Sequence, residues 1–189
     1  MNKSVLKQLV KTLFSDLDES TLNILLEHTN YVKHTSGTKI IIEGKRHHYF
    51  YFIIQGSVKS YYLKDSQEVC SWFAFENDMV ATMKSFAGEP SNETIELLED
   101  SELIQINTES FKKIAATNLS VSQLIIELLA EHTIFLEDRI YLLQFMSSKE
   151  RYENLVKAEP QILQRVSLTD IASFLGVSRE TLSRIRVKK

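Results

Sequence analysis

The chain has 189 residues, of which 43% are hydrophobic and 25% are charged, and its formal net charge is -3. Its single cysteine, Cys70, excludes an internal disulfide, a four-cysteine iron-sulfur cluster and a zinc site built from several cysteines. No apolar run approaches the roughly 20 residues that span a bilayer, and the first residues lack the continuous apolar stretch of a secretory signal. These features predict a cytoplasmic globular protein with a sizeable core and no membrane partner.

The charge is unevenly distributed along the chain. Residues 1–159 carry 16 Lys and Arg against 23 Asp and Glu, a net of -7. Residues 160–189 carry six basic side chains against Asp170 and Glu180, a net of +4. A short basic segment therefore follows an acidic body. This segment suits a nucleic-acid partner if its residues also form a DNA-binding motif.

Residues 5–14 begin the pattern of elements, because their apolar side chains repeat with the helical period. Asp18 and Ser20 can then cap the start of a second short helix that carries Leu22, Leu25 and Leu26. We expect both segments to be amphipathic helices that pack against the rest of the chain.

From Tyr31 to Ile106 the pattern changes to β-branched and aromatic runs separated by turn residues. The runs cover residues 39–42, 49–54, 57–63, 69–75, 94–97 and 102–106. Short strands at this spacing predict an antiparallel β domain, either a sandwich or a roll. Gly44 and Gly56 bracket the central aromatic strand, where tight turns would require a positive φ.

After Thr108 the helical period returns and continues to about residue 146. Apolar and other side chains step by three and four at Ile125, Leu129, His132, Leu136, Arg139, Leu143 and Met146. A second row runs beside them at Leu124, Leu128, Phe135, Leu142 and Phe145. A helix with two adjoining apolar faces is either a fully buried central helix of one domain or a dimerisation helix near residues 121–146.

Residues 167–186 have the pattern of two short helices joined by a tight turn. Ser167 and Asp170 approximate a capping box at the start of the first helix, Gly176 ends it, and Ser178 can cap the second. Small Ala172 permits a close helix crossing. These features together predict a helix-turn-helix unit.

The second helix of such a unit lies in the major groove of DNA and reads bases near its N-terminus. Its predicted outward side chains are Ser178, Arg179, Glu180, Thr181, Ser183, Arg184 and Arg186. Arginine can bind guanine O6 and N7 with two hydrogen bonds, glutamate can accept from cytosine N4, and hydroxyls suit phosphate. Arg179, Glu180 and Arg184 are therefore the expected base-reading residues, and a solvated basic helix end is the alternative.

A β domain, a long helix and the run from Ser178 to Ile185 resemble the Crp/Fnr family of bacterial transcription regulators. The resemblance implies an α+β fold: an antiparallel β-roll like a cyclic-nucleotide-binding jelly roll with flanking helices in residues 1–115, a dimerisation helix in 116–148 and a helix-turn-helix domain in 149–189. It also implies a homodimer on a palindromic DNA operator, with RNA polymerase as a further partner. That family commonly continues into a β-hairpin wing, and here Lys188 and Lys189 are expected to supply backbone charge instead.

The expected effector pocket departs from the pattern of family members that bind cyclic AMP. Ala81-Thr82 stands where those members have Gly-Glu, and Ser91-Asn92 stands where they have the Arg-Ser pair that holds the cyclic phosphate. A buried phosphate without its arginine loses a strong charge-assisted contact. We therefore expect no control by cyclic AMP, no cofactor and an unknown effector. The expected pocket residues are Val80, Ala81, Thr82, Met83, Ser91, Asn92 and Thr94.

No constellation of catalytic or metal-binding residues is visible in the sequence. His47 and His48 are adjacent, so on an extended strand they would point to opposite faces and could not easily share a metal. Cys70 is interpreted as a small core residue and His132 as a histidine of the helix seam. We therefore predict no metal and no enzyme activity. The alternatives left open are a β-roll that binds a small ligand and a cupin-like metal enzyme.

Overall fold

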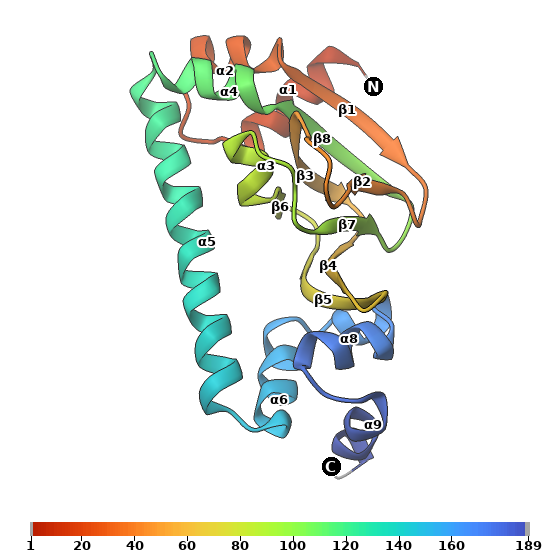
Figure 1. Cartoon of the computed structure of the whole chain (residues 1–189). Helices are drawn as coiled ribbons and strands as arrows, with labels where there is room; N and C mark the ends of the chain where they lie inside the picture. The colour runs from red at the N-terminus through yellow and green to blue at the C-terminus, as the bar shows by residue number, and fades with distance from the viewer. Residues whose placement is uncertain (1, 188–189) are drawn as a thin grey trace.

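The computed structural model describes residues 2–187 and consists of a β-roll, one long helix and a C-terminal group of short helices (Figure 1). The helices are α1 (Lys3–Leu13), α2 (Glu19–Leu26), α3 (Met83–Ala87), α4 (Thr108–Ala115), α5 (Leu119–Phe145), α6 (Ser148–Ala158), α7 (Ile162–Arg165), α8 (Leu168–Leu175) and α9 (Arg179–Val187). The strands are β1 (Thr29–His34), β2 (Lys39–Ile41), β3 (Tyr49–Gln55), β4 (Val58–Lys64), β5 (Gln67–Ala74), β6 (Met79–Val80), β7 (Thr94–Leu97) and β8 (Ser101–Asn107). The expected domain boundaries fall between α4 and α5 and at the start of α6. Lys188 and Lys189 lie outside the described residues.

The strands form two four-stranded antiparallel sheets, ordered β1-β8-β3-β6 and β2-β7-β4-β5. Buried side chains from both sheets, among them Ile53, Val58, Leu97 and Leu103, meet in one core. This arrangement confirms the predicted antiparallel β-roll with flanking helices. The sequence did not predict β1 and β6. The two residues of β6 are too few to show an alternating pattern.

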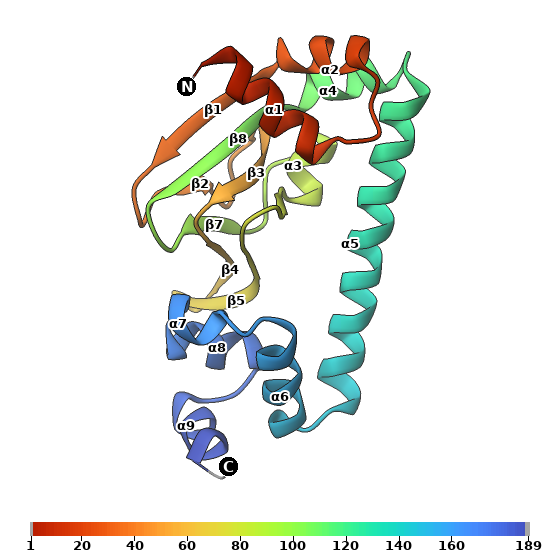
Figure 2. The ribbon, with the colours of Figure 1, turned by 180° about the vertical axis from the view of Figure 1, so that it is seen from behind.

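The N-terminal helices and α4 pack against a second core that lies on one side of the roll (Figure 2). Phe14 of the segment after α1 meets Phe52 of β3 edge to face, with ring centroids 5.2 Å apart. Asp18 caps α2 by accepting hydrogen bonds from the backbone N–H groups of Ser20 and Thr21. Asp18 is therefore the N-cap, whereas Ser20 lies inside the helix.

The long helix α5 is 27 residues long, and by length and composition it could cross a bilayer. The sequence analysis did not recognise this property, because Glu127 and Glu131 interrupt the apolar run. The segments joined by α5 nevertheless contact each other directly, since α8 packs against β5 (Figure 1). A bilayer crossed by α5 would have to lie between those segments. The observed contacts are incompatible with that arrangement.

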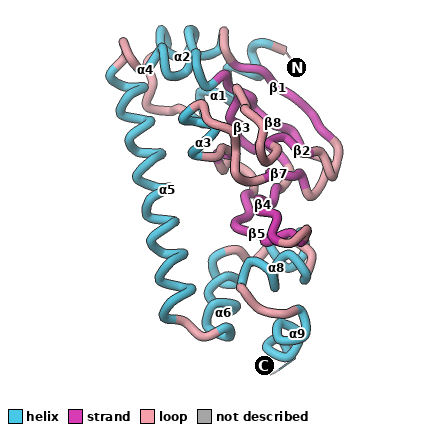
Figure 3. Tube along the Cα trace, in the orientation of Figure 1, coloured by secondary structure: helices cyan, strands magenta, loops and turns pink. Residues whose placement is uncertain are grey.

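The C-terminal region consists of helices and connecting loops throughout its described residues (Figure 3). Its core contains Ile162, Ile171, Leu175 and Leu182, and it continues into the roll through Cys70 of β5 and Phe75. The aromatic rings of Phe73 and Phe174 extend this contact, with centroids 5.3 Å apart. The helical region therefore shares a hydrophobic core with one end of the roll.

Candidate nucleic-acid interface

The backbone of α8 and α9 has the caps that the sequence predicts for a helix-turn-helix unit. The Ser167 hydroxyl accepts the backbone N–H of Asp170 at 3.1 Å and starts α8. Gly176 ends α8 with a φ of 67°, in the left-handed region that favours glycine. The Ser178 hydroxyl then accepts the N–H of Thr181 at 3.2 Å at the start of α9. Ser167, Gly176 and Ser178 thus have their expected roles, whereas the Asp170 carboxylate accepts from the Ser167 hydroxyl at 2.7 Å and does not complete the capping box.

The two helices close over a small apolar core. Ile171, Ala172 and Leu175 of α8 and Leu182 of α9 are buried. Val177 and Ile185 are half-buried and pack against the same cluster. The small Ala172 side chain lies at this contact, and its burial is consistent with the close crossing expected from the sequence.

The opposite side of α9 presents charged and polar side chains to solvent. Ser178, Arg179, Glu180, Ser183, Arg184 and Arg186 are exposed, and Thr181 is half-buried. Within residues 2–187, no ion pair of 4.0 Å or shorter involves Arg179, Arg184 or Arg186. Arg184 donates to the Thr181 hydroxyl at 3.2 Å. The exposed face therefore combines three arginines with one glutamate.

The Glu180 carboxyl remains ionised on this face. Its pKa is lowered mainly by its own backbone N–H group, then by the Ser178 hydroxyl and by the nearby Arg179 and Arg184. An ionised glutamate accepts hydrogen bonds and donates none, so at neutral pH Glu180 can accept from a base amino group.

Two further arginines hold α8 in place from outside the unit. Arg139 of α5 donates to the backbone carbonyl of Phe174 and stacks on its ring, with the guanidinium carbon 3.9 Å from the ring centroid. Arg151 of α6 donates to the carbonyl of Leu175 at 3.1 Å. Both therefore bind carbonyls at the C-terminal end of α8, where cations are favourable. The spacing of α5 places Arg139 on the helix seam and gives no sign of this role.

The predicted seam of α5 divides between two surfaces. Ile125, His132, Arg139 and Met146 are half-buried against this chain, whereas Leu129, Leu136 and Leu143 are exposed. The exposed members continue into a stripe with steps of three and four, which we call the outer stripe: Ile126, Leu129, Thr133, Leu136, Ile140 and Leu143. Within α5 only Val121 is fully buried, so the interpretation as a buried central helix is wrong for this chain.

The expected effector-pocket residues differ in their surroundings. Val80, Thr82, Ser91 and Thr94 are buried, and Asn92 is exposed. Ala81 and Met83 instead line a groove between the roll and α5. The buried hydroxyls bind the chain itself: Thr82 caps α3 at 3.1 Å, Ser91 donates to the carbonyl of Glu93 at 2.7 Å, and Thr94 accepts the N–H of Glu43 at 3.1 Å.

Glu93 occupies the inner side of the roll next to these residues. It shares the alternation of Ile95 and Leu97, which face the core, and it is 7% exposed. One carboxylate oxygen accepts hydrogen bonds from the hydroxyls of Ser60 and Ser71 and from the indole N–H of Trp72, the last at 3.1 Å. No described Lys, Arg or His forms an ion pair with this carboxylate. In the sequence, the signal for Glu93 is a glutamate at a position that alternates with the inward-facing Ile95 and Leu97.

The cysteine and the adjacent histidines singled out in the sequence differ in burial and in hydrogen bonding. Cys70 is buried, its backbone N–H donates to the Ser173 hydroxyl at 2.9 Å, and burial raises the pKa of its thiol. The interpretation of Cys70 as a core residue is therefore confirmed. A ring nitrogen of His47 accepts the N–H of Ile42 at 2.8 Å, and His48 is exposed. Within residues 2–187 no group of three His, Cys, Asp or Glu side chains is placed to hold a metal ion.

Comparison with known proteins places this geometry in a fold family. Residues 31–118 match the family described as cyclic nucleotide-binding domain. FixK2 from Bradyrhizobium japonicum is 20% identical with a TM-score of 0.75, covering 85% of this chain and 83% of that chain. A structure assigned to the Crp/Fnr family of transcriptional regulators, from Eubacterium rectale, is 22% identical with a TM-score of 0.73, covering 92% and 83%.

A third similar structure is CLP from Xanthomonas campestris, described as a global regulator responsive to c-di-GMP. It is 20% identical with a TM-score of 0.67, covering 90% of this chain and 91% of that chain. Among curated proteins, no significant match to this chain was found. Residues 31–118 are thus similar to the cyclic nucleotide-binding domain, and the predicted resemblance to the Crp/Fnr family is confirmed at the level of the fold.

Proposed function

We propose that this chain is a DNA-binding transcription regulator of the Crp/Fnr type. The observation that carries the proposal is the exposed face of α9, where Arg179, Glu180 and Arg184 lie on the second helix of a well-formed helix-turn-helix unit. Since no described carboxylate pairs with these arginines, DNA would not have to displace an existing ion pair. The similar structures described as transcription regulators support the same proposal.

In this function the N-terminal part of α9 enters the major groove. Arg179 and Arg184 would bind guanine edges, and Glu180 would accept from cytosine N4. Ser178, Thr181, Ser183 and Arg186 would contact the sugar-phosphate backbone, which positions the helix without reading sequence. The bound protein would act in the cytoplasm and, by analogy with the family, would contact RNA polymerase.

The proposed DNA-binding form is a homodimer on a two-fold-symmetric operator. The outer stripe of α5 supplies its interface, because side chains at steps of three and four form a seam for a second helix. Several of them are large and apolar, and Ile126 is 65% exposed in the isolated chain. An exposed apolar stripe of this length is typical of a surface that another helix covers.

We further infer that cyclic AMP does not control this protein. A cyclic phosphate inside the roll would meet the Glu93 carboxylate, and the buried Thr82, Ser91 and Thr94 hydroxyls already bind the chain itself. The electrostatic repulsion would be strong in a buried site. Calorimetry with the purified protein should therefore detect no cyclic AMP binding at micromolar concentration, and micromolar or tighter binding would overturn this part of the proposal.

The DNA-binding proposal is tested by selecting DNA fragments with the parent protein and repeating the binding with Arg179→Ala and Arg184→Ala. Each substitution should weaken specific binding by about fivefold to 150-fold, since a bidentate guanine contact contributes about 1 to 3 kcal/mol. Thermal unfolding should be unchanged because both side chains are exposed. Equal protection of the same sites by the double variant would show that α9 does not read the sequence.

A further inference from the structure

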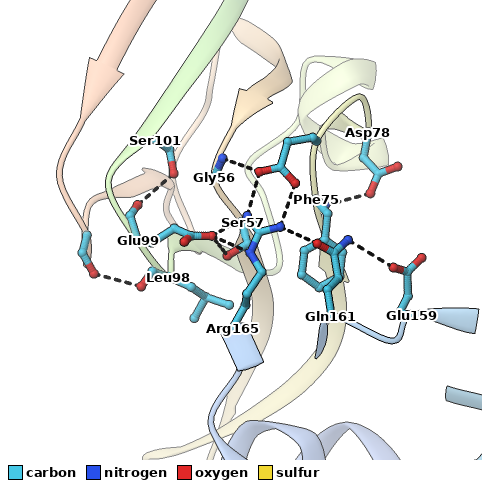
Figure 4. Close-up of polar contacts among 12 residues, drawn as sticks. Gly56, Ser57, Phe75, Asp78, Leu98, Glu99, Ser101, Glu159, Gln161 and Arg165 are labelled. Atoms are coloured by element: carbon cyan, nitrogen blue, oxygen red, sulfur yellow. Dashed lines mark hydrogen bonds and ion pairs between the residues drawn. The ribbon is translucent and has the colours of Figure 1, made fainter. Parts of the chain in front are cut away.

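Arg165, at the end of α7, links the helix-turn-helix region to the β-roll by hydrogen bonds (Figure 4), beside the packing of α8 on β5 and the ion pair between Lys59 and Asp170. Its guanidinium makes five hydrogen bonds. Two go to the Glu76 carboxylate at 2.7 and 2.8 Å, two to the Glu99 carboxylate at 2.9 and 2.5 Å, and one to Gln161 at 2.6 Å. Because Arg165 lies three residues before α8 begins, its position fixes the entry into the helix-turn-helix unit.

Both carboxylates are themselves held by the roll (Figure 4). Glu76 follows β5 and also accepts the backbone N–H of Gly56 at 2.9 Å. Glu99 lies between β7 and β8 and also accepts the Ser57 hydroxyl at 2.6 Å. Two separate turns of the roll therefore meet on one planar cation. The bidentate contact with Glu76, and the two N–H groups that share one oxygen of Glu99, restrict direction as well as distance.

This attachment leaves the candidate DNA-reading surface open. The base-reading candidates of α9 are exposed, and the principal packing contacts of α9 are with α8 and α6. Arg165 is 19% exposed and pairs with Glu76 and Glu99 of the roll. The contact therefore does not mask α9 but sets how the unit that carries it is oriented.

We propose that Arg165 is a positioning residue for DNA recognition, which orients the helix-turn-helix unit on the roll so that the two α9 helices of a dimer match a fixed half-site spacing. This inference rests on the proposed function. When one of two rigidly oriented units has bound its half-site, the second unit is held close to the other half-site. Its effective concentration there is therefore high. Units that pivot would bind a single half-site equally well but would lose this advantage and tolerate more spacings.

The test uses the full chain and DNA duplexes that the parent protein selects from a random-sequence pool. The variant is Arg165→Ala, and the matched control is Arg46→Ala, an exposed arginine of the roll that contacts the Gly88 carbonyl. Each is titrated onto the two-half-site duplex, one half-site alone, and duplexes with one or two base pairs inserted between half-sites. Glu99→Gln repeats the comparison with a milder change, in case Arg165→Ala lowers the folded fraction.

For Arg165→Ala we expect about tenfold weaker binding to the two-half-site duplex, unchanged binding to one half-site, and reduced discrimination between spacings. Glu99→Gln should show the same pattern with a smaller change, and Arg46→Ala should match the parent. Unchanged affinity and spacing preference in both interface variants would overturn the role of Arg165. So would an equal loss on one and two half-sites, which would indicate general destabilisation. Failure of the parent to select any DNA would instead overturn the proposed function.

Discussion

Arginines in two regions of this molecule have opposite surroundings. On α9, Arg179, Arg184 and Arg186 are exposed, and no described carboxylate pairs with them. Where α8 meets the rest of the chain, Arg165 and Arg139 are bound to carboxylates or carbonyls of the chain itself. The same residue type thus serves internal attachment in one region and remains available to an external anion in the other. Exposure and pairing distinguish these two uses, whereas residue type does not.

The difference follows from the energetics of charge. A partly buried guanidinium is tolerated when its donors are satisfied, and all five bonds of Arg165 provide this. An exposed guanidinium remains hydrated and can exchange water and counterions for phosphate or bases. The exposed arginines of α9 should therefore affect DNA binding with little effect on folding. The paired arginines should affect orientation and stability.

The largest expected effect tests whether the α9 arginines of two protomers bind DNA together as a dimer. Leu136→Glu places a charge in the middle of the outer stripe, so we expect a monomer and more than about 100-fold weaker binding to a two-half-site duplex. Ile134→Glu is the matched control, because Ile134 is also exposed but lies on another side of α5. Sedimentation and DNA titration measure both properties. If Ile134→Glu were monomeric and Leu136→Glu dimeric, the dimer interface would lie on the other face of α5, and its assignment to the outer stripe would be wrong.

Local signals explain what could be predicted from the sequence. Ser167, Gly176 and Ser178 determine helix ends within a few residues of themselves, so the helix-turn-helix unit was predicted correctly. The turn residues and alternating runs likewise predicted the roll. The carbonyl that Arg139 binds and the two carboxylates that Arg165 binds lie 35 to 89 residues away along the chain. Spacing along a single sequence contains no information about which distant carbonyl or carboxylate comes near, so these roles required the structure.

Glu93 extends the comparison to a buried anion, and its removal should have the next largest effect. Glu93→Ala leaves the buried Ser60 hydroxyl and the Trp72 indole N–H without their acceptor, so we expect the free energy of unfolding to fall by about 2 to 3 kcal/mol. Glu93→Gln should cost less, because its amide oxygen can still accept. Urea unfolding measures both changes. Glu96→Ala, a half-buried glutamate on the other face of β7, is the control, and a smaller loss for Glu93→Ala than for Glu96→Ala would contradict this role.

The smallest expected effect is a pH dependence of stability, which the paired arginines should show and the unpaired arginines should not. The pKa of Glu76 is lowered from 4.5 to about 2, mainly by the hydrogen bond from Arg165 and also by the backbone N–H groups of Gly56 and of Glu76 itself. Between these values the unfolded chain binds more protons at this carboxyl than the folded chain, so its contribution to stability is complete above pH 4.5 and is lost as pH falls toward 2. Because the Glu76 side chain is 33% exposed, solvent screens the pair, and the contribution should be below about 1 kcal/mol.

The stability difference between the parent and Glu76→Gln should therefore be larger near pH 6 than near pH 3 in urea unfolding at low salt. Arg186→Ala should show no such change, because Arg186 is exposed and has no described ion-pair partner whose protonation could alter its contribution. A Glu76→Gln difference that is the same at both pH values would mean that the ion pair with Arg165 does not form in solution. Arg165 would then be held to the roll by Glu99 alone, and the contrast between the two regions would be weaker.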